Sequence, residues 1–185
     1  MRKILFITLI FIGITNIAFS QFKSIGGGIT LATGAKYELS GLKYFNNSKA
    51  LDLRLTYDIK KKKSLVTKIN LFYPNSEDLA DNGFSKVSLF TLASDFHYTP
   101  KPKNMLRVYY LIGPTAMLWK IKDQHYSTAL NKIYDINELK FSYGLNLGAG
   151  INFDINRSYK MFLETKYIVS KNNQLLFTTG VSYTL

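Results

Sequence analysis

The sequence predicts an all-β fold, an eight-stranded antiparallel up-and-down barrel, and three observations support this prediction. Apolar residues alternate with polar or small ones over long stretches, most clearly over residues 139–155. A period of two is typical of a strand with two chemically different faces. Turn-forming segments separate these stretches, and no helical period, heptad or internal repeat of 20 to 50 residues is present. We therefore expect one domain of strands that are connected as neighbouring hairpins.

The first twenty residues have the layout of a cleaved secretory signal. Arg2 and Lys3 precede an apolar run that ends in the small-x-small sequence Ala18-Phe19-Ser20. The alternative is a retained transmembrane helix, but the apolar run of about sixteen residues is slightly shorter than a full span requires. We expect cleavage between Ser20 and Gln21, a signal peptide at 1–20 and a single barrel domain at 21–185.

Composition narrows the class of protein further. The chain has no cysteine, which excludes an acylated cysteine anchor, disulfides and thiolate metal sites. Without Arg2 and Lys3 it has 22 basic and 12 acidic residues, a net charge of +10. No recognition motif for nucleic acid accompanies this charge, and an exported chain rarely meets nucleic acid. An anionic lipid surface is therefore the expected counter-charge.

The expected strands follow one another along the mature chain. Six of them alternate clearly, whereas those at 86–98 and 105–121 alternate less cleanly. Long polar connections are expected at 34–49, 74–85 and 122–138, and the other connections are short. The full set of expected strands is 24–33, 50–59, 64–73, 86–98, 105–121, 138–155, 159–169 and 175–185.

One irregularity stands out within 105–121. The apolar residues occupy even positions up to Ile112 and odd positions from Met117 onward. Proline cannot donate a hydrogen bond to a neighbouring strand, and a closed sheet has no free edge to accommodate it. One extra residue at Gly113-Pro114 would explain both features, so we expect a β-bulge with a parity switch there.

Two barrel architectures fit this alternation, and they place the apolar face on opposite sides. A soluble lipid-carrier barrel turns it inward, whereas a membrane barrel turns it toward lipid and has a polar interior. The polar face here is rich in small residues, including Gly144, Gly148, Gly150 and Gly180, and eight strands leave an interior just wide enough for side chains. The strand lengths are close to the nine to eleven residues that a tilted membrane strand needs. The thirteen tyrosines cluster near strand ends, where they suit the membrane interfaces. These features favour a transmembrane barrel.

With these features the chain resembles the small outer-membrane β-barrel proteins of Gram-negative bacteria, the porin family or outer membrane protein β-barrel domain. The resemblance covers nearly the whole mature chain, including "YYLIGPTAML", "YGLNLGAGINF" and the C-terminal "TTGVSYTL". It implies an outer-membrane location, contact with outer-membrane lipids and lipopolysaccharide, insertion by the barrel assembly machinery, and a monomer. The family's C-terminal assembly signal usually ends in Phe, and its matching positions here are Thr178, Gly180, Tyr183 and Leu185.

Charged residues recur on the face that is expected to point inward. They could line a polar channel or form a salt-bridge network that fills the lumen. We favour the network, because an eight-strand interior is narrow and buried charges need partners. The candidate interior residues are Asp52, Arg54, Asp58, Lys68, Lys160, Glu164 and Lys166.

The sequence contains little that indicates catalysis. His97, near Asp95, is expected to be a structural hydrogen-bonding residue. "HYST" at 125–128 resembles the "HYSN" stretch of lipid A deacylases, in which His and Ser act with a later Glu, and Glu138 follows here. The stretch falls in an expected loop, however, and nucleophilic catalysis needs a fixed geometry.

We therefore expect a non-enzymatic barrel without a catalytic, cofactor or metal site. Its expected role is structural, or surface interaction through its three long loops. The alternatives are a small channel or conduit for hydrophobic solutes and a lipid A deacylase-like enzyme.

Overall fold

A computed structural model describes residues 22–33, 38–39, 42–43, 48–79, 83–127 and 132–185. The expected cleavage point between Ser20 and Gln21 lies outside these residues. Within the described ranges, no helix is long and apolar enough to cross a membrane.

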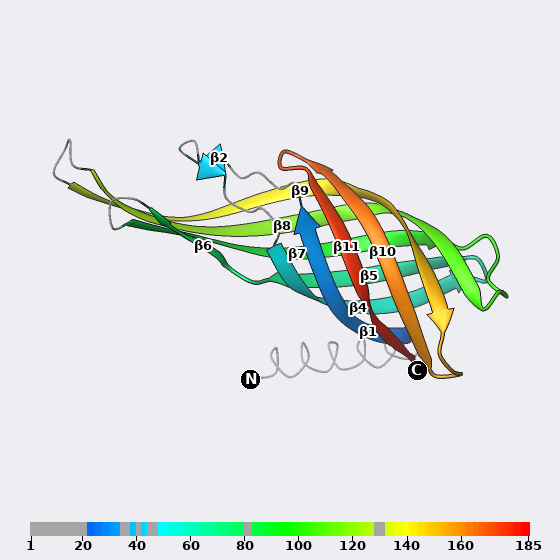
Figure 1. Ribbon diagram of the computed structural model, residues 1–185. Coiled ribbons are helices and arrows are strands. Elements are labelled where there is room, and N and C mark those ends of the chain that lie inside the picture. Colours follow the sequence, from blue (N-terminus) through cyan, green and yellow to red (C-terminus); the bar gives the residue numbers. More distant parts are fainter. Residues whose placement is uncertain (1–21, 34–37, 40–41, 44–47, 80–82, 128–131) are drawn as a thin grey trace, which may run out of the picture.

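The described strands form a closed antiparallel barrel of eight strands, as the sequence predicts (Figure 1). Each strand pairs with its neighbour along the chain, and β11 pairs with β1, with Gly28 opposite Gly180. The pairing of β5 with β7 completes the ring. The barrel strands are β1 (Phe22–Thr33), β4 (Ser48–Lys60), β5 (Lys63–Phe72), β7 (Gly83–Tyr98), β8 (Leu106–Ser127), β9 (Lys132–Asp154), β10 (Tyr159–Ser170) and β11 (Gln174–Thr184).

Three short strands lie outside this ring. β2 (Glu38–Leu39) pairs with β3 (Leu42–Lys43) as a separate two-stranded sheet. β6 (Asn75–Leu79) pairs with the first part of β7 and extends the main sheet on one side.

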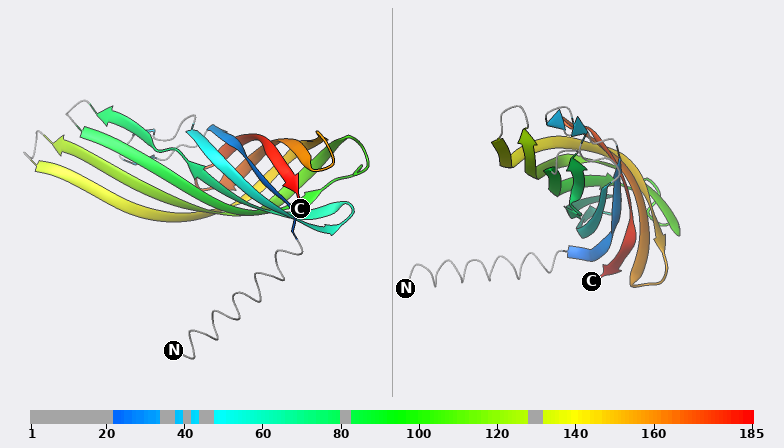
Figure 2. Two further views of the ribbon diagram at one scale, coloured as in Figure 1. Left: turned by 90° about the horizontal axis from the view of Figure 1, so that it is seen from below. Right: turned by 60° about the vertical axis from the view of Figure 1, so that its left-hand side comes forward.

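One side of the barrel is much taller than the other. β8 and β9 remain paired from Leu106 opposite Phe153 to Ser127 opposite Lys132. Together with β6 and the start of β7 they form a wall that projects beyond the ring (Figures 1 and 2). The expectation of a long polar loop at 122–138 is therefore wrong, because most of this segment continues the β8–β9 ladder. Much of the expected loop at 74–85 likewise pairs as β6 with β7.

The expected bulge at Gly113-Pro114 is also absent. The register of β8 against β9 runs without a shift from one end to the other, with Gly113 opposite Asn146 and Pro114 opposite Leu145. Against β7 the pairing skips Gly113 and Pro114, because proline has no N–H to donate, but it resumes in the same register. Odd positions therefore point inward along β8 from Arg107 to Ile121. The apparent switch arises because the interior itself becomes apolar beyond Thr115, at Met117, Trp119 and Ile121.

The outer surface of the ring is an apolar belt. Leu163 is 56 % exposed and Leu53 is 53 % exposed, although both lie in the middle of strands. Their neighbours along each strand point inward and are buried, so the alternation of the sequence becomes an inside and an outside. Exposed apolar residues are contributed by all eight strands, and they include Ile29, Leu53, Leu71, Leu92, Val108, Ile112, Leu147, Leu163 and Val181.

Candidate functional site

The barrel interior is filled by side chains in successive layers along its axis. Going from the short-turn end toward the tall wall, β8 presents Arg107, Tyr109, Gly113, Thr115 and Trp119 to the lumen. Taken over all eight strands together, the inward side chains change in this direction from basic through ion-paired and uncharged polar to mainly apolar.

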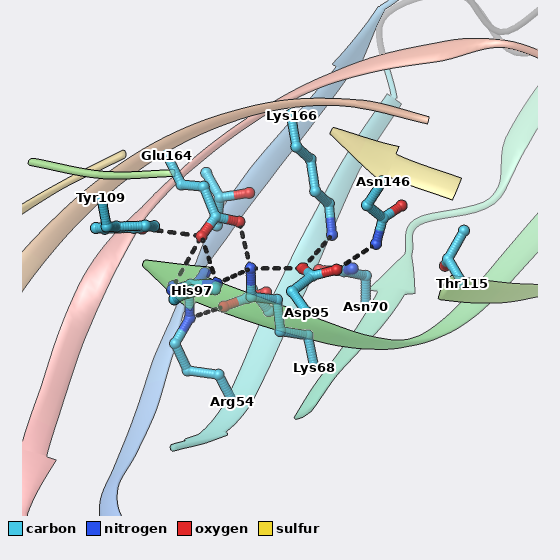
Figure 3. Close-up of polar contacts among 12 residues, drawn as sticks. Arg54, Lys68, Asn70, Asp95, His97, Tyr109, Thr115, Asn146, Glu164 and Lys166 are labelled. Carbon is cyan, nitrogen blue, oxygen red and sulfur yellow. Dashed lines mark hydrogen bonds and ion pairs between the residues drawn. The ribbon is translucent and has the colours of Figure 1, made fainter. Parts of the chain in front are cut away.

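The charged layer is centred on Lys68 and Glu164 (Figure 3). The Lys68 ammonium lies 2.6 Å from a Glu164 carboxylate oxygen and 2.8 Å from a carboxylate oxygen of Asp95. The amide of Asn146 donates to the other Asp95 oxygen at 2.7 Å. Lys166 lies 3.9 Å from Asp95, on the far side of it from Glu164. All of these side chains are buried, and together they connect strands β5, β7, β9 and β10 across the lumen.

A second group of side chains completes the environment of Glu164. The Arg54 Nε donates to Asp52 at 2.8 Å, and its Nη1 lies 3.5 Å from Glu164. The Tyr109 hydroxyl donates to Glu164 at 2.8 Å. The His97 ring stacks on the Tyr109 ring, with centroids 4.5 Å apart. A single buried carboxylate is thus surrounded by a lysine, an arginine and a phenol, which compensates for its burial.

The structure brings together five of the seven expected interior charges, namely Asp52, Arg54, Lys68, Glu164 and Lys166. Asp58 lies at the short-turn mouth instead, where it is partly exposed and pairs with Lys23. Lys160 is half-buried at the same mouth.

Asp95, Tyr109 and Asn146 belong to this cluster but are not among the interior charges expected from the sequence, and His97 was expected only to form structural hydrogen bonds. The alternation of odd and even positions could have indicated which of these residues point inward. Asp95 and His97 occupy odd positions in a strand whose even positions Phe90, Leu92 and Phe96 are apolar. These two residues therefore share the inward face.

Glycines on the inner face make room for the charged layer. A Cβ at Gly150 would collide with the Tyr109 ring. A Cβ at Gly113 would lie 2.6 Å from the Cα of Asp95 and 2.8 Å from its carboxylate. The small residues on the inner face thus leave the space that the large polar side chains occupy.

Above the charged layer, the interior changes first to uncharged polar and then to apolar side chains. The Thr30 hydroxyl lies 2.9 Å from that of Thr178, and Asn70 donates to Thr91 at 3.0 Å. The indole of Trp119 is 1 % exposed and donates to Ser142 at 3.0 Å. The apolar cluster consists of Ala32, Ala50, Phe72, Val87, Leu89, Met117, Trp119, Ile121, Ile168 and Leu176. The lumen is therefore closed toward the tall wall.

We expected the stretch at 125–128 to lie in a loop, but the structure places His125 to Ser127 in a strand, and Thr128 lies outside the described residues. This strand is β8, with His125 opposite Tyr134 and Ser127 opposite Lys132. The Glu138 carboxylate pairs with Lys140 at 2.7 Å. In the part of the chain that the structure describes, no three His, Asp or Glu side chains gather as a metal site would require.

Thr178, Gly180 and Tyr183 of the assembly signal lie in β11, next to the closure of the barrel, and Leu185 directly follows that strand. Gly180 is packed against the backbone of β1 and the ring of Phe162. Tyr183 faces outward with its ring 5.3 Å from that of Tyr159, and the Leu185 N–H donates to the Lys23 carbonyl at 2.8 Å. Thr178 points inward to Thr30.

A closed ring with an apolar outer belt and a polar, ion-paired interior is a transmembrane β-barrel, because soluble barrels have the opposite arrangement. More particularly, the fold is that of small outer-membrane β-barrel proteins, which confirms the expected fold class and the resemblance at the level of fold. Searches of protein-family models and of curated proteins found no match to this chain.

Solved outer-membrane barrels share the fold at low sequence identity. OprG of Pseudomonas aeruginosa has a TM-score of 0.61 at 14 % identity, over 89 % of this chain and 96 % of that one. Ail, the attachment invasion locus protein of Yersinia pestis, was solved with the heparin analogue sucrose octasulfate. It has a TM-score of 0.56 at 14 % identity, over 89 % and 97 % of the two chains. Neisserial surface protein A has a TM-score of 0.55 at 11 % identity, over 89 % and 96 %.

Proposed function

We propose that this chain is a non-enzymatic protein of the bacterial outer membrane with a closed lumen, which acts through contacts of its tall wall with anionic molecules at the cell surface. The single observation that carries the proposal is the filled interior. A charged layer and an apolar layer follow each other along the axis, so a hydrated path through the barrel is not available. On the side of the tall wall, the projecting surface is therefore the part that remains for function.

The wall carries a basic cluster on its outward face. Lys86 on β7 lies directly opposite Lys122 on β8, and Lys120 lies opposite Ser88 one step nearer the ring. All three lysines are exposed, and like charges that face each other across two strands destabilise the pair unless a counter-charge is present. They lie just beyond Phe90 and Leu118, where the apolar belt ends on these strands. This is the level of the headgroups, so the phosphates of lipopolysaccharide are the proposed counter-charge.

The surface role is tested with the purified barrel in an uncharged detergent. Lipopolysaccharide is added, and the amount that stays with the barrel through size exclusion is measured. Changing Lys86, Lys120 and Lys122 to Gln should reduce that amount severalfold. Changing Lys61, Lys62 and Lys63 to Gln removes the same charge at the opposite end and should leave it unchanged. An equal loss of bound lipopolysaccharide in both variants would show that only net charge matters. That result would contradict the assignment of binding to the tall wall.

The two alternative functions make different predictions. A channel or solute conduit would give sustained conductance in a planar bilayer, whereas a barrel with a closed lumen should give none. A large porin measured in the same bilayer is the positive control. A deacylase would remove an acyl chain from lipid A, and mass spectra of lipid A from cells with and without the chain test this. His125→Ala is the matched variant for the second experiment.

The remaining parts of the proposal concern export and assembly. The signal peptide at 1–20 would direct the chain across the inner membrane. The assembly machinery would then recognise β11 through Gly180, Tyr183 and Leu185, and the product would be a monomer, because the barrel closes on itself.

A further inference from the structure

The short-turn end of the barrel contains a cavity whose lining comes from all eight barrel strands. Its volume is about 140 Å³, which exceeds the roughly 30 Å³ share of one water molecule several times. The β4–β5 turn at Lys61 and Lys62 and the β7–β8 connection at Thr99 and Pro102 border its opening. The cavity is therefore the open mouth of the lumen itself and is not a groove on the lipid-facing side.

The mouth is strongly basic. Its lining includes eight basic side chains and one carboxylate, that of Asp58. Asp58 pairs with Lys23, and Arg107 pairs with Asp154 at 2.7 Å. Lys160 is half-buried and forms no ion pair with any described residue. The four lysines Lys60 to Lys63 at the rim are exposed. A recess of low dielectric that is lined by one sign of charge concentrates the opposite charge.

Arg54 forms part of the inner end of the mouth. Its side chain is 5 % exposed, and the guanidinium lies 3.5 Å above the centre of the Phe162 ring. Nε and Nη1 face Asp52 and Glu164, but the buried Nη2 has no hydrogen-bond partner among the described residues. Buried donors are almost always satisfied, so an orphaned one at a cavity indicates a missing acceptor.

The mouth is a dead end. Tyr109, Phe162 and His97 line its inner part, and the layer of ion pairs around Glu164 lies directly behind them. An anion that enters from the short-turn side can bind there but cannot pass through.

We propose that this mouth binds the phosphate group of a soluble phosphorylated solute. Phosphate has several acceptor oxygens and more than one negative charge, which suits a guanidinium donor at the inner end together with lysine ammonium groups on the walls. The cavity has the size for one such group. Because strands enclose it on every side, a phospholipid headgroup in the surrounding bilayer does not reach it.

The experiment uses the full barrel in an uncharged detergent, with inorganic phosphate as the probe and calorimetry or phosphorus NMR line widths as the readout. We expect saturable binding to wild type. The affinity should weaken about tenfold in Lys160→Gln, which corresponds to about 1.4 kcal/mol of binding free energy. Lys171→Gln removes one exposed charge from the β10–β11 turn, at the opposite end of the barrel, and should bind like wild type. No saturable binding to wild type, or equal weakening in the two variants, would overturn the proposal.

Two further measurements determine which group binds and where. Arg54→Lys retains the charge but loses Nη2, and it should also weaken binding. Because that change could disturb the buried layer, Lys160→Gln remains the primary variant. Acetate that binds as tightly as phosphate would overturn the choice of a phosphate ligand. Loss of phosphate binding in vesicles of anionic phospholipid, but not in uncharged vesicles, would identify a headgroup as the occupant and overturn the soluble ligand. None of these results depends on the proposed role of the outer wall.

Discussion

The ammonium of Lys68 on β5 and the carboxylate of Glu164 on β10 lie 2.6 Å apart, although β5 and β10 are four strands from each other around an eight-stranded ring. The pair therefore spans the full width of the lumen. Both side chains are almost completely buried, at 0 % and 1 % exposure, so water does not compensate either charge.

Removing one partner of this pair should destabilise the barrel strongly. Glu164→Gln leaves Lys68 and Arg54 with less negative charge in a buried site, and losses of about 3–5 kcal/mol are typical of broken buried ion pairs. Urea unfolding of the barrel in lipid vesicles measures this change. Lys68→Met combined with Glu164→Gln should cost less than the sum of the single changes, because the two groups interact directly. Additive costs would show that the pair is not energetically coupled.

The glycines of the inner face should not tolerate alanine where a side chain packs against them. Gly150→Ala places a methyl group against the Tyr109 ring, and the resulting overpacking should cost about 1–3 kcal/mol. Gly27→Ala is the matched control, because its Cβ would make only ordinary contacts, at 3.6 Å from the Asp52 carbonyl oxygen and 3.9 Å from Leu53. We expect that control to change the free energy of unfolding by less than about 1 kcal/mol. Equal costs would contradict the packing described for Tyr109.

The two faces of β9 should respond to different substitutions. Leu147 is 43 % exposed on the outer belt, and Leu147→Arg should cost about 2–4 kcal/mol, since it places a charge in hydrocarbon. Leu147→Ile is the control for that position and should be nearly neutral. Asn146 is fully buried and donates to Asp95, so Asn146→Ser should cost about 1–3 kcal/mol through the lost hydrogen bond. Folded yield in vesicles and urea unfolding report both effects, and a harmless Leu147→Arg would reverse the assignment of inside and outside.

The two ends of the barrel should differ in their accessibility on intact cells. Long connections face the outside in this class and short turns face the periplasm. An epitope tag inserted between Leu79 and Gly83, or between Ser127 and Lys132, should therefore be labelled by antibody on whole cells. A tag between Lys61 and Lys62 should be labelled only after the outer membrane is opened. The reverse pattern of labelling would invert the proposed orientation.

Closure of the barrel should depend on the last strand. Every backbone group in hydrocarbon needs a partner, and the partner of β1 on this side is β11. Tyr183→Ala, or deletion of Thr184 and Leu185, should reduce the fraction of heat-modifiable protein in outer-membrane fractions. Leu185→Phe restores the aromatic residue that is usual at this position and should insert at least as well as wild type. Normal insertion of the deletion variant would remove the basis for an assembly signal here.

The sequence predicted the interior site only in part, and the reason is geometric. The period of two determines which face a residue occupies, so Asp52, Arg54, Lys68, Glu164 and Lys166 could be placed inside from local pattern alone. It does not determine which inward residues meet across the lumen. That depends on the stagger between strands and on the closure of the ring. Asp95 and Asn146 become partners only because β7 and β9 present them at the same height.

The irregular strand 105–121 illustrates the same limit. Met117, Trp119 and Ile121 are apolar and point inward, and local pattern alone could not distinguish an apolar interior layer from a change of face. The length of the wall was missed for a similar reason, since polar residues at 122–138 are typical of a loop until pairing along the whole of β8 and β9 places them in a ladder.

The sequence by itself determined the number, order and antiparallel connection of the barrel strands and the apolar outer face, because these follow from an alternation that each strand carries locally. The tertiary structure alone decided the layered filling of the lumen, the cross-lumen contact of Lys68 with Glu164, the height of the wall and the basic mouth. The lumen layers, the Lys68–Glu164 contact and the mouth arise from residues that are distant along the chain and that meet only when a tilted, staggered ring closes. The height of the wall depends on how far pairing continues along β8 and β9.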